Sequence, residues 1–326
     1  MTTTQLKSVF ADYGPASLLR DRTVVPDGFE LDFIETGTPI QGMARMVRDL
    51  EFDIVDMSPT TFLAARSMGV PVIGMPIAMF AEFPHALIWT HRASNIREPA
   101  DLRGKTIGLR TWLTPVAAWM RGMLAIEYGV ELDDVKWKLT VADTLDVKLP
   151  PNAERIVTDP KTHKLLEMIN SGEADAVIDA STLQWHHAVE QRKVDPTLVQ
   201  SLFPDTHEFT TALHRHFGYL PIMHFVVAKG AMLEQHPTAA RTLFEAFGKA
   251  KELYFDRLRA GTTTTDRAEW LVARDRDNRE MLELGIDPLP MGDEVVAIIE
   301  RLMGFMVKYG YIPQPLDIRS QFAQVR

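Results

Sequence analysis

Cysteine is absent from this chain of 326 residues, which excludes disulfide bonds, thiolate metal sites and a cysteine nucleophile. A basic face is lacking as well, because 35 lysines and arginines stand against 44 aspartates and glutamates. The net charge of −9 argues against a nucleic-acid partner. No apolar run approaches the roughly 18 residues that span a bilayer, so no membrane partner is expected. The sequence also lacks a glycine-rich phosphate loop and a Gly-x-Ser-x-Gly elbow.

What is present is an ordinary soluble composition, with 46% hydrophobic and 24% charged residues. The length favours two lobes over one. The start, Met1-Thr2-Thr3-Thr4, has no basic region, no long apolar region and no cleavage site of a secretory signal. We therefore expect a cytoplasmic protein.

Short apolar strands alternate with amphipathic helices along the chain, which predicts α/β layers with mainly parallel sheets. Ser58 is expected to cap a helix that has Pro59 at its first position. Gly129 and Gly172 are expected to end two further helices. Strands are predicted at 6–10, 29–34, 52–57, 70–75, 86–90, 106–109, 135–139 and 176–178, and helices at 40–50, 115–128, 163–171, 238–259, 265–284 and 293–309.

Two histidines lie in strand-like apolar runs. His224 lies within the run from Tyr219 to Val227, and His85 within the run from Pro84 to Trp89. An α/β segment separates them, which indicates two lobes joined by crossing strands, with each histidine near the cleft between the lobes. By contrast, His214 and His216 are expected on an exposed loop, and the adjacent His186 and His187 match no common metal-binding spacing.

Several segments spread over nearly the whole chain resemble the 4,5-dihydroxyphthalate decarboxylase family, within the type II periplasmic-binding-protein fold. These segments are Glu51-Phe52-Asp53-Ile54-Val55-Asp56-Met57-Ser58, Phe83-Pro84-His85, 96–105, 119–124, Leu202-Phe203-Pro204-Asp205 and Pro221-Ile222-Met223-His224. The resemblance implies a first lobe of residues 1–90 and 226–326 and a second of residues 91–225. It places the crossing strands and the cleft near 85–92 and 221–228.

The resemblance implies non-oxidative decarboxylation of a small hydroxylated aromatic or heteroaromatic acid of the phthalate or benzoate type. Such chemistry needs a group that takes a phenolic proton and delivers a proton to carbon, and histidine titrates in the right range. His224 is the first candidate for this role. His85 is expected to act as partner acid or as a donor to a substrate hydroxyl, and Asp56 to orient a histidine or accept from the substrate.

Substrate contacts are expected from residues near strand ends. Arg110 follows a strand and can fork onto a carboxylate, Thr111 lies beside it, and Trp112 can stack on an aromatic ring. Ser58 and Thr60, together with Thr61, lie where helix amides would meet an anion.

The chain departs from the family pattern around His85. The family usually reads Arg-x-Phe-Arg-His there, whereas this chain has Ala81 and Pro84 in place of the two arginines. An arginine appears instead at position 110, and Thr111 replaces a usual glutamate. We therefore expect a substrate with fewer or differently placed carboxylates than a phthalate.

Alternatives remain open at this level. A non-catalytic solute-binding protein for a small aromatic or carboxylate ligand would share the fold. Synthases of the thiamin pyrimidine precursor also resemble this fold, but they need a cysteine-rich motif that is absent. No cofactor and no metal are expected, although His85, His224 and Asp56 could together hold a divalent ion. The apolar residues of 295–306 could be core or a homodimer surface.

Overall fold

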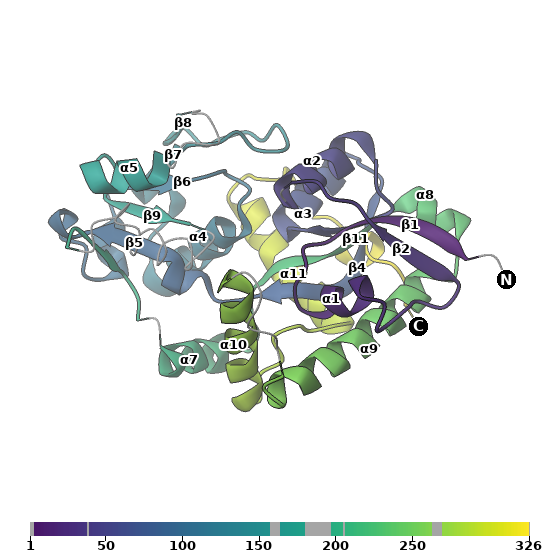
Figure 1. Cartoon of the computed structure of the whole chain (residues 1–326). Helices are drawn as coiled ribbons and strands as arrows, with labels where there is room; N and C mark the ends of the chain where they lie inside the picture. Colours follow the sequence, from purple (N-terminus) through teal and green to yellow (C-terminus); the bar gives the residue numbers. More distant parts are fainter. Residues whose placement is uncertain are drawn as a thin grey trace. The chain divides into compact units, whose positions relative to one another are not determined.

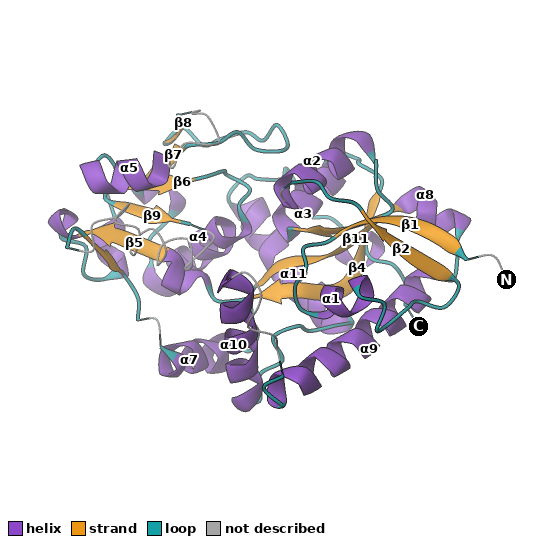
Figure 2. Ribbon diagram, viewed as in Figure 1, coloured by secondary structure: helices purple, strands orange, loops and turns teal. Residues whose placement is uncertain are grey.

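The computed structural model describes residues 3–37, 39–156, 164–179, 197–204, 206–262 and 269–325 (Figure 1). The chain divides into two compact units. The first comprises 1–82, 222–301 and 314–326, and the second comprises 83–221 and 302–313. Each unit combines a sheet with helices (Figure 2), so each is described by itself.

A five-stranded sheet with the order β2-β1-β3-β11-β4 forms the centre of the first unit. Its strands are β1 (Thr4–Val9), β2 (Phe29–Phe33), β3 (Ile54–Met57), β4 (Val72–Ala81) and β11 (Ile222–Lys229). β1 runs parallel to β2 and β3, whereas β11 runs antiparallel to β3 and β4. The prediction of mainly parallel sheets fails at β11 here and at β5 in the second unit. Because β4 ends at Ala81 and β11 begins at Ile222, and these residues pair, these two strands run in opposite directions.

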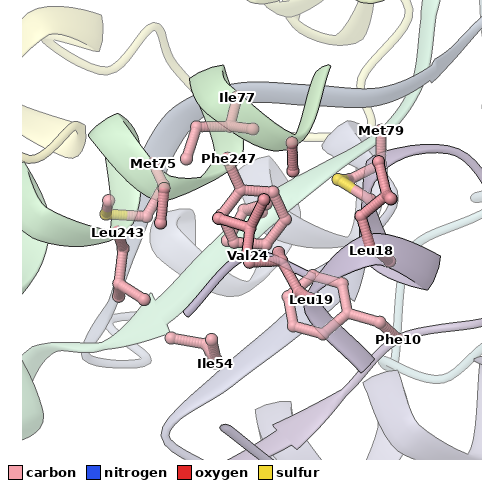
Figure 3. Packing of buried hydrophobic residues seen from close by; sticks show 14 of the residues in the cluster. Phe10, Leu18, Leu19, Val24, Ile54, Met75, Ile77, Met79, Leu243 and Phe247 are labelled. Atoms are coloured by element: carbon pink, nitrogen blue, oxygen red, sulfur yellow. The ribbon is translucent and has the colours of Figure 1, made fainter. Parts of the chain in front are cut away.

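Helices cover both faces of this sheet, and the strands bury alternate residues toward each face. On one face, α1 (Pro15–Arg20) and α9 (Ala239–Arg259) enclose a hydrophobic cluster (Figure 3). Its members include Phe10, Leu18, Leu19, Val24, Ile54, Met75, Ile77, Met79, Val226, Ala228, Leu243 and Phe247. On the other face, Phe62 of α3 (Pro59–Ser67) packs edge-on against Phe225. Burying one such side chain contributes about 1.5–3 kcal/mol.

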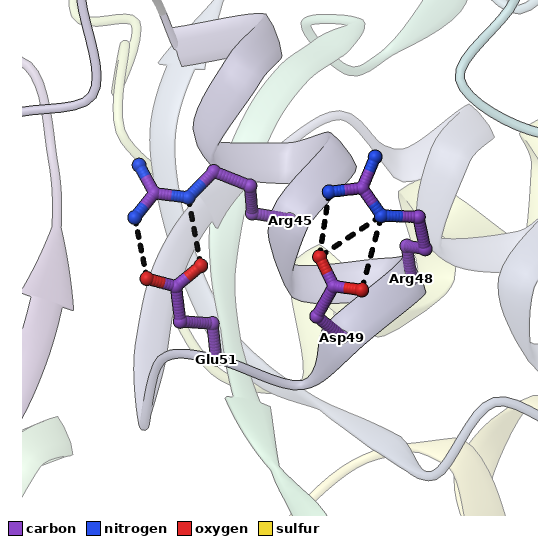
Figure 4. A network of polar contacts seen from close by, with 4 residues as sticks. All are labelled: Arg45, Arg48, Asp49 and Glu51. Atoms are coloured by element: carbon purple, nitrogen blue, oxygen red, sulfur yellow. Dashed lines mark hydrogen bonds and ion pairs between the residues drawn. The ribbon is translucent and has the colours of Figure 1, made fainter.

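The other described α-helices of this unit are α2 (Pro39–Asp49), α8 (Gly230–Gln235), α10 (Glu269–Glu283) and the first part of α11 (Asp293–Lys308). α2 ends in a turn in which Leu50 adopts a φ of 50°, the left-handed region. Two ion pairs flank this turn (Figure 4): Arg45 binds Glu51, and Arg48 binds Asp49. Hydrogen bonds from the arginines lower the pKa values of both carboxyls. Exposed pairs of this kind contribute little stability.

The second unit contains a six-stranded sheet with the order β10-β5-β9-β6-β7-β8. Its strands are β5 (Ile88–His91), β6 (Thr106–Leu109), β7 (Lys136–Leu139), β8 (Ala153–Arg155), β9 (Ala176–Ile178) and β10 (Val199–Ser201). The α-helices described before residue 222 are α4 (Pro115–Tyr128), α5 (Lys164–Ser171) and α7 (His207–Phe217). Strands β9, β6, β7 and β8 are parallel, while β5 is antiparallel to β9 and β10. Gly129 ends α4 in the left-handed conformation at a φ of 61°, as expected.

Two local predictions were wrong. His85 does not lie on a strand but on a 3-10 turn, η1 (Pro84–Leu87), and β5 begins only at Ile88. Proline has a fixed φ and no N–H, which suits the first position of a helical turn better than a strand ladder. His214 and His216 lie in the last turn of α7 rather than on a loop, where His216 pairs with Glu127 at 2.7 Å.

The division of the chain differs from the expected lobes at the C-terminus. Residues 302–313, including the end of α11, group with the second unit, so the chain passes between the units at four points rather than two. Within the second unit this segment packs on α4. Trp119 meets Phe305 edge-on, and Tyr311 stacks on Trp112 with ring centroids 5.2 Å apart. The apolar residues at the end of α11 therefore include core residues such as Leu302 and Met306.

None of the described helices has both the length and the apolar character needed to cross a bilayer.

Candidate functional site

Period-two alternation brings Asp56 and His224 to the same face of the first unit's sheet. Ile54 and Val226 both belong to the cluster beneath α1 and α9, so Asp56 and His224, each two residues away, project to that side as well. Val226 on β11 pairs with Asp56 on β3, and His224 lies two residues before Val226. His224 is therefore the diagonal neighbour of Asp56 across the two strands. Side chains at such a spacing can touch.

A hydrogen-bonded row links three side chains here. The Tyr13 hydroxyl donates to Asp56 Oδ2 at 2.6 Å, and His224 Nδ1 lies 3.2 Å from the same oxygen. Tyr13 and Asp56 are 7% and 3% exposed, whereas the His224 side chain is 22% exposed. The row therefore begins in the core and ends at a histidine that solvent reaches.

The hydrogen bonds of the row orient its members. A carboxylate only accepts, so His224 Nδ1 carries its proton toward Asp56 and Nε2 is the nitrogen that can exchange protons. Burial, together with the adjacent Asp56 carboxylate, raises the pKa of Tyr13 well above its usual value. Tyr13 consequently stays a donor to Asp56 at any physiological pH.

Phe80 and Arg274 lie next to His224 in the first unit. The Phe80 ring lies edge-on to the His224 ring at 6.3 Å between centroids. The Arg274 guanidinium carbon, on α10, lies 3.2 Å from the centroid of Phe80. All three side chains are half-buried rather than enclosed.

The hydroxyls at the start of α3 hydrogen-bond to one another. Ser58 Oγ accepts from the Thr61 amide at 3.3 Å, which confirms Ser58 as the helix cap. Ser58 Oγ also contacts Thr60 Oγ1 at 3.2 Å and Thr61 Oγ1 at 2.8 Å. Asp56 takes no part in capping. A substrate-binding role for Ser58 and Thr60 stays a prediction.

His85 lies in the second unit and is 1% exposed. Aromatic rings surround it, with Phe203 at 4.9 Å and Phe209 at 5.8 Å between centroids. Neither ring nitrogen has a hydrogen-bond partner among the described residues. Burial lowers the pKa of His85 to about 4. The imidazole is therefore neutral near pH 7 and can donate one N–H. A role for His85 as partner acid or as a donor to a substrate hydroxyl stays a prediction.

Arg110, Thr111 and Trp112 follow β6 in the second unit. Arg110 is half-buried, and Thr111 Oγ1 lies 2.6 Å from Thr114 Oγ1. Trp112 is 0% exposed, because Tyr311 stacks on it and the Arg121 guanidinium carbon lies 3.8 Å from its ring centroid. The expectation that Trp112 offers a face to the substrate is therefore wrong for this structure. The sequence could not show that residues 302–313 return to cover this tryptophan.

A metal site has no support in the part of the chain that the structure describes, where no three histidine, aspartate or glutamate side chains gather. His163, His186 and His187 lie outside the described residues. Sequence reasoning missed Tyr13 and Arg274. Tyr13 is 43 positions away from Asp56, and only the packing of α1 against the sheet brings them together.

Comparison with solved structures identifies the fold. The sulfonate-binding protein SsuA of Methylobacillus flagellatus matches with a TM-score of 0.63 and 13% identity, over 99% of this chain and 92% of that one. The alkanesulfonate-binding protein SsuA of Xanthomonas axonopodis pv. citri, bound to MOPS, matches at 0.61 and 14%, over 99% of both chains. The desulfurization enzyme DszB, as a cysteine-to-serine mutant with biphenyl-2-sulfinic acid, matches at 0.57 and 14%, over 98% and 96%. The chain has the two-lobed periplasmic-binding-protein fold predicted for it.

Sequence comparison narrows the class. The family described as NMT1/THI5 like matches residues 27–147. A 4,5-dihydroxyphthalate decarboxylase of Comamonas testosteroni is 25% identical over 289 residues, which cover 86% of this chain and 85% of that protein. A protein of the same name from Pseudomonas putida is 30% identical over 168 residues, 49% of this chain and 64% of its own length. The resemblance to the 4,5-dihydroxyphthalate decarboxylases is confirmed.

Proposed function

We propose that this protein decarboxylates a small hydroxylated aromatic acid, with His224 as the residue that moves the proton. The observation that carries the proposal is the row from buried Tyr13 through Asp56 to half-buried His224. Two relatives that bear the name of a decarboxylase support the same reaction class.

The row gives His224 the properties of a proton shuttle. Asp56 holds the ring by Nδ1 and stabilises the imidazolium, as a carboxylate does wherever it orients a catalytic histidine. Tyr13 in turn fixes the Asp56 carboxylate by donating to it. Nε2 of His224 is left to face the substrate, first as a base and then as an acid.

The proposed steps balance as follows. Nε2 takes the proton of a substrate hydroxyl ortho or para to the carboxylate, leaving a phenolate. The imidazolium returns this proton to the ring carbon that bears the carboxylate, and the ring becomes a dienone. The carbon–carboxylate bond then breaks, CO2 leaves, and the bonding pair restores the aromatic phenolate. A proton from solvent completes the product, so the reaction consumes one proton overall.

Other candidate residues take part only as further proposals. Arg110 and Thr111 are proposed to bind the substrate from the end of β6, and the Ser58 and Thr60 hydroxyls from the start of α3. His85 is proposed as a partner acid or as a donor to a substrate hydroxyl, and its neutral form near pH 7 suits the second role. The mechanism calls for no organic cofactor, because the substrate hydroxyl accepts the charge that develops in the ring.

The test is CO2 release from a panel of hydroxylated benzoates, phthalates and heteroaromatic acids, each run with and without chelator. We expect release from at least one member that has a hydroxyl ortho or para to a carboxylate, and none from the matching acid without that hydroxyl. If no member of the panel releases CO2, the proposal is contradicted. If none releases CO2 but one acid raises the thermal stability of the protein, a solute-binding protein is favoured instead.

A further inference from the structure

The positive charge of Arg274 has no ion-pair partner among the described carboxylates. The Phe80 ring lies between Arg274 and His224 and contacts both. The guanidinium carbon of Arg274 lies over the Phe80 ring, and the Phe80 and His224 rings form a T-shaped pair. The next residue, Asp275, accepts a hydrogen bond from Tyr254 at 2.7 Å and points into the core, where it is 5% exposed. The other arginines of α10 with acidic partners, Arg276 and Arg279, pair with Asp277 and Glu283.

Among the described residues, no hydrogen bond or ion pair engages the N–H groups of Arg274, whose guanidinium carbon lies over the Phe80 ring. A guanidinium that lies flat on an aromatic ring engages its face, while its N–H groups radiate in the plane and can fork onto a carboxylate. The stacking also holds the planar group in place, which reduces the entropy lost when a ligand binds. Arg274 and Phe80 are both half-buried, so the edge is accessible while the face is packed.

The positive charge also reaches the proton-moving row. Arg274 acts to lower the pKa of Tyr13 against the larger opposing effects of burial and Asp56. This coupling indicates that the guanidinium and the row share one electrostatic environment within the first unit.

We propose that Arg274 binds the anionic substituent that the substrate keeps, a second carboxylate that remains on the product. The inference rests on the proposed function, because it takes His224 as the point where the other carboxylate leaves. An arginine paired with the departing carboxylate would stabilise the ground state and lose its partner as neutral CO2 forms, which raises the barrier. An arginine paired with the retained carboxylate binds substrate, transition state and product alike. It therefore positions the ring without opposing the reaction.

This assignment agrees with an expectation from the sequence. Ala81 and Pro84 stand where the resemblance described above leads us to expect arginines. Arg274 would supply a cation from a different element, which agrees with the expectation of a differently placed carboxylate.

The test measures binding and turnover separately in Arg274→Gln, Arg274→Lys and the control Arg276→Gln on the exposed side of the same helix. The probes are 3,4-dihydroxybenzoate, which is 4,5-dihydroxyphthalate less one carboxylate, and catechol, which lacks both. We expect Arg274→Gln to weaken 3,4-dihydroxybenzoate binding about 10- to 100-fold, the loss of a charge-assisted pair. Catechol binding should not change. The affinity of Arg274→Lys for 3,4-dihydroxybenzoate should lie between those of the parent protein and Arg274→Gln. Lysine keeps the positive charge but cannot form two parallel hydrogen bonds to a carboxylate.

Turnover supplies the second readout. For 4,5-dihydroxyphthalate, Arg274→Gln should raise KM by a similar factor and leave kcat within a few-fold, while Arg276→Gln matches the parent protein. Unchanged 3,4-dihydroxybenzoate affinity in a folded Arg274→Gln protein would overturn the assignment, even if CO2 release proceeds. Loss of affinity in a protein that releases no CO2 would support Arg274 as the carboxylate site and refute only the decarboxylase.

Discussion

His224 and His85, the two histidines that the sequence indicates as candidates, differ in how deeply they are buried. His224 has a carboxylate partner and access to solvent, whereas His85 is buried and has no hydrogen-bond partner among the residues that the structure describes. Both occur in apolar runs of similar appearance, so the sequence could not tell a proton shuttle from a buried ring. The difference arises from what packs around each: Asp56 from a paired strand at one, and phenyl rings at the other.

His85 should make stability depend on pH. Its folded pKa of about 4 lies below the usual 6.5, so the unfolded chain takes up a proton first as pH falls. The stabilising effect is fully present above pH 6.5 and is lost as pH falls through about 4. The full loss is about 3 kcal/mol.

Urea unfolding at pH 7.5 and pH 5 tests this expectation. The parent protein should lose stability between the two pH values, and His85→Phe, which suits a pocket of aromatic rings, should lose about 2 kcal/mol less. His214→Gln, a half-buried histidine of α7, serves as the control. An equal loss in the parent protein and His85→Phe would mean that the His85 ring is not held neutral by burial.

Among the elements, the close approach of α4 and the end of α11 decides how the second unit is built. A Cβ added to Gly122 of α4 would lie 2.3 Å from the Phe305 ring, closer than any real contact. Gly304 lies one residue before Phe305, and a Cβ added to Gly304 would have no other atom within 4 Å. The two glycines therefore form a matched pair on facing helices.

Gly122→Ala and Gly304→Ala should change stability in opposite directions. Alanine is the better helix former by about 1 kcal/mol, so Gly304→Ala should stabilise the protein by up to that amount. Gly122→Ala should destabilise it by about 1–3 kcal/mol, because the rigid ring must move. Thermal or urea unfolding of both variants measures this. Equal stabilisation by both would contradict the packing of Phe305 on Gly122.

At the scale of the whole molecule, periodicity predicted the elements well and their assembly less well. The cap at Ser58, the end of α4 at Gly129 and most strands follow from local rules that the printed sequence displays. The return of residues 302–313 to the second unit depends on which core accepts Phe305 and Tyr311, and an amphipathic pattern does not contain that information. The same holds for Tyr13 and Arg274, whose positions depend on how α1 and α10 pack on a sheet built from distant segments.

The initial rate of CO2 release at saturating substrate, compared between the parent protein and His224→Gln, tests the central claim most directly. Glutamine has a comparable length and can hydrogen-bond to Asp56, but it cannot carry a proton between oxygen and carbon. We predict a fall in kcat of about 10²- to 10⁴-fold, the usual contribution of a general acid–base residue, with KM within a few-fold. His236→Gln, which changes a half-buried histidine of the same unit, should retain the parent rate. A His224→Gln protein with a rate within threefold of the parent would contradict the account.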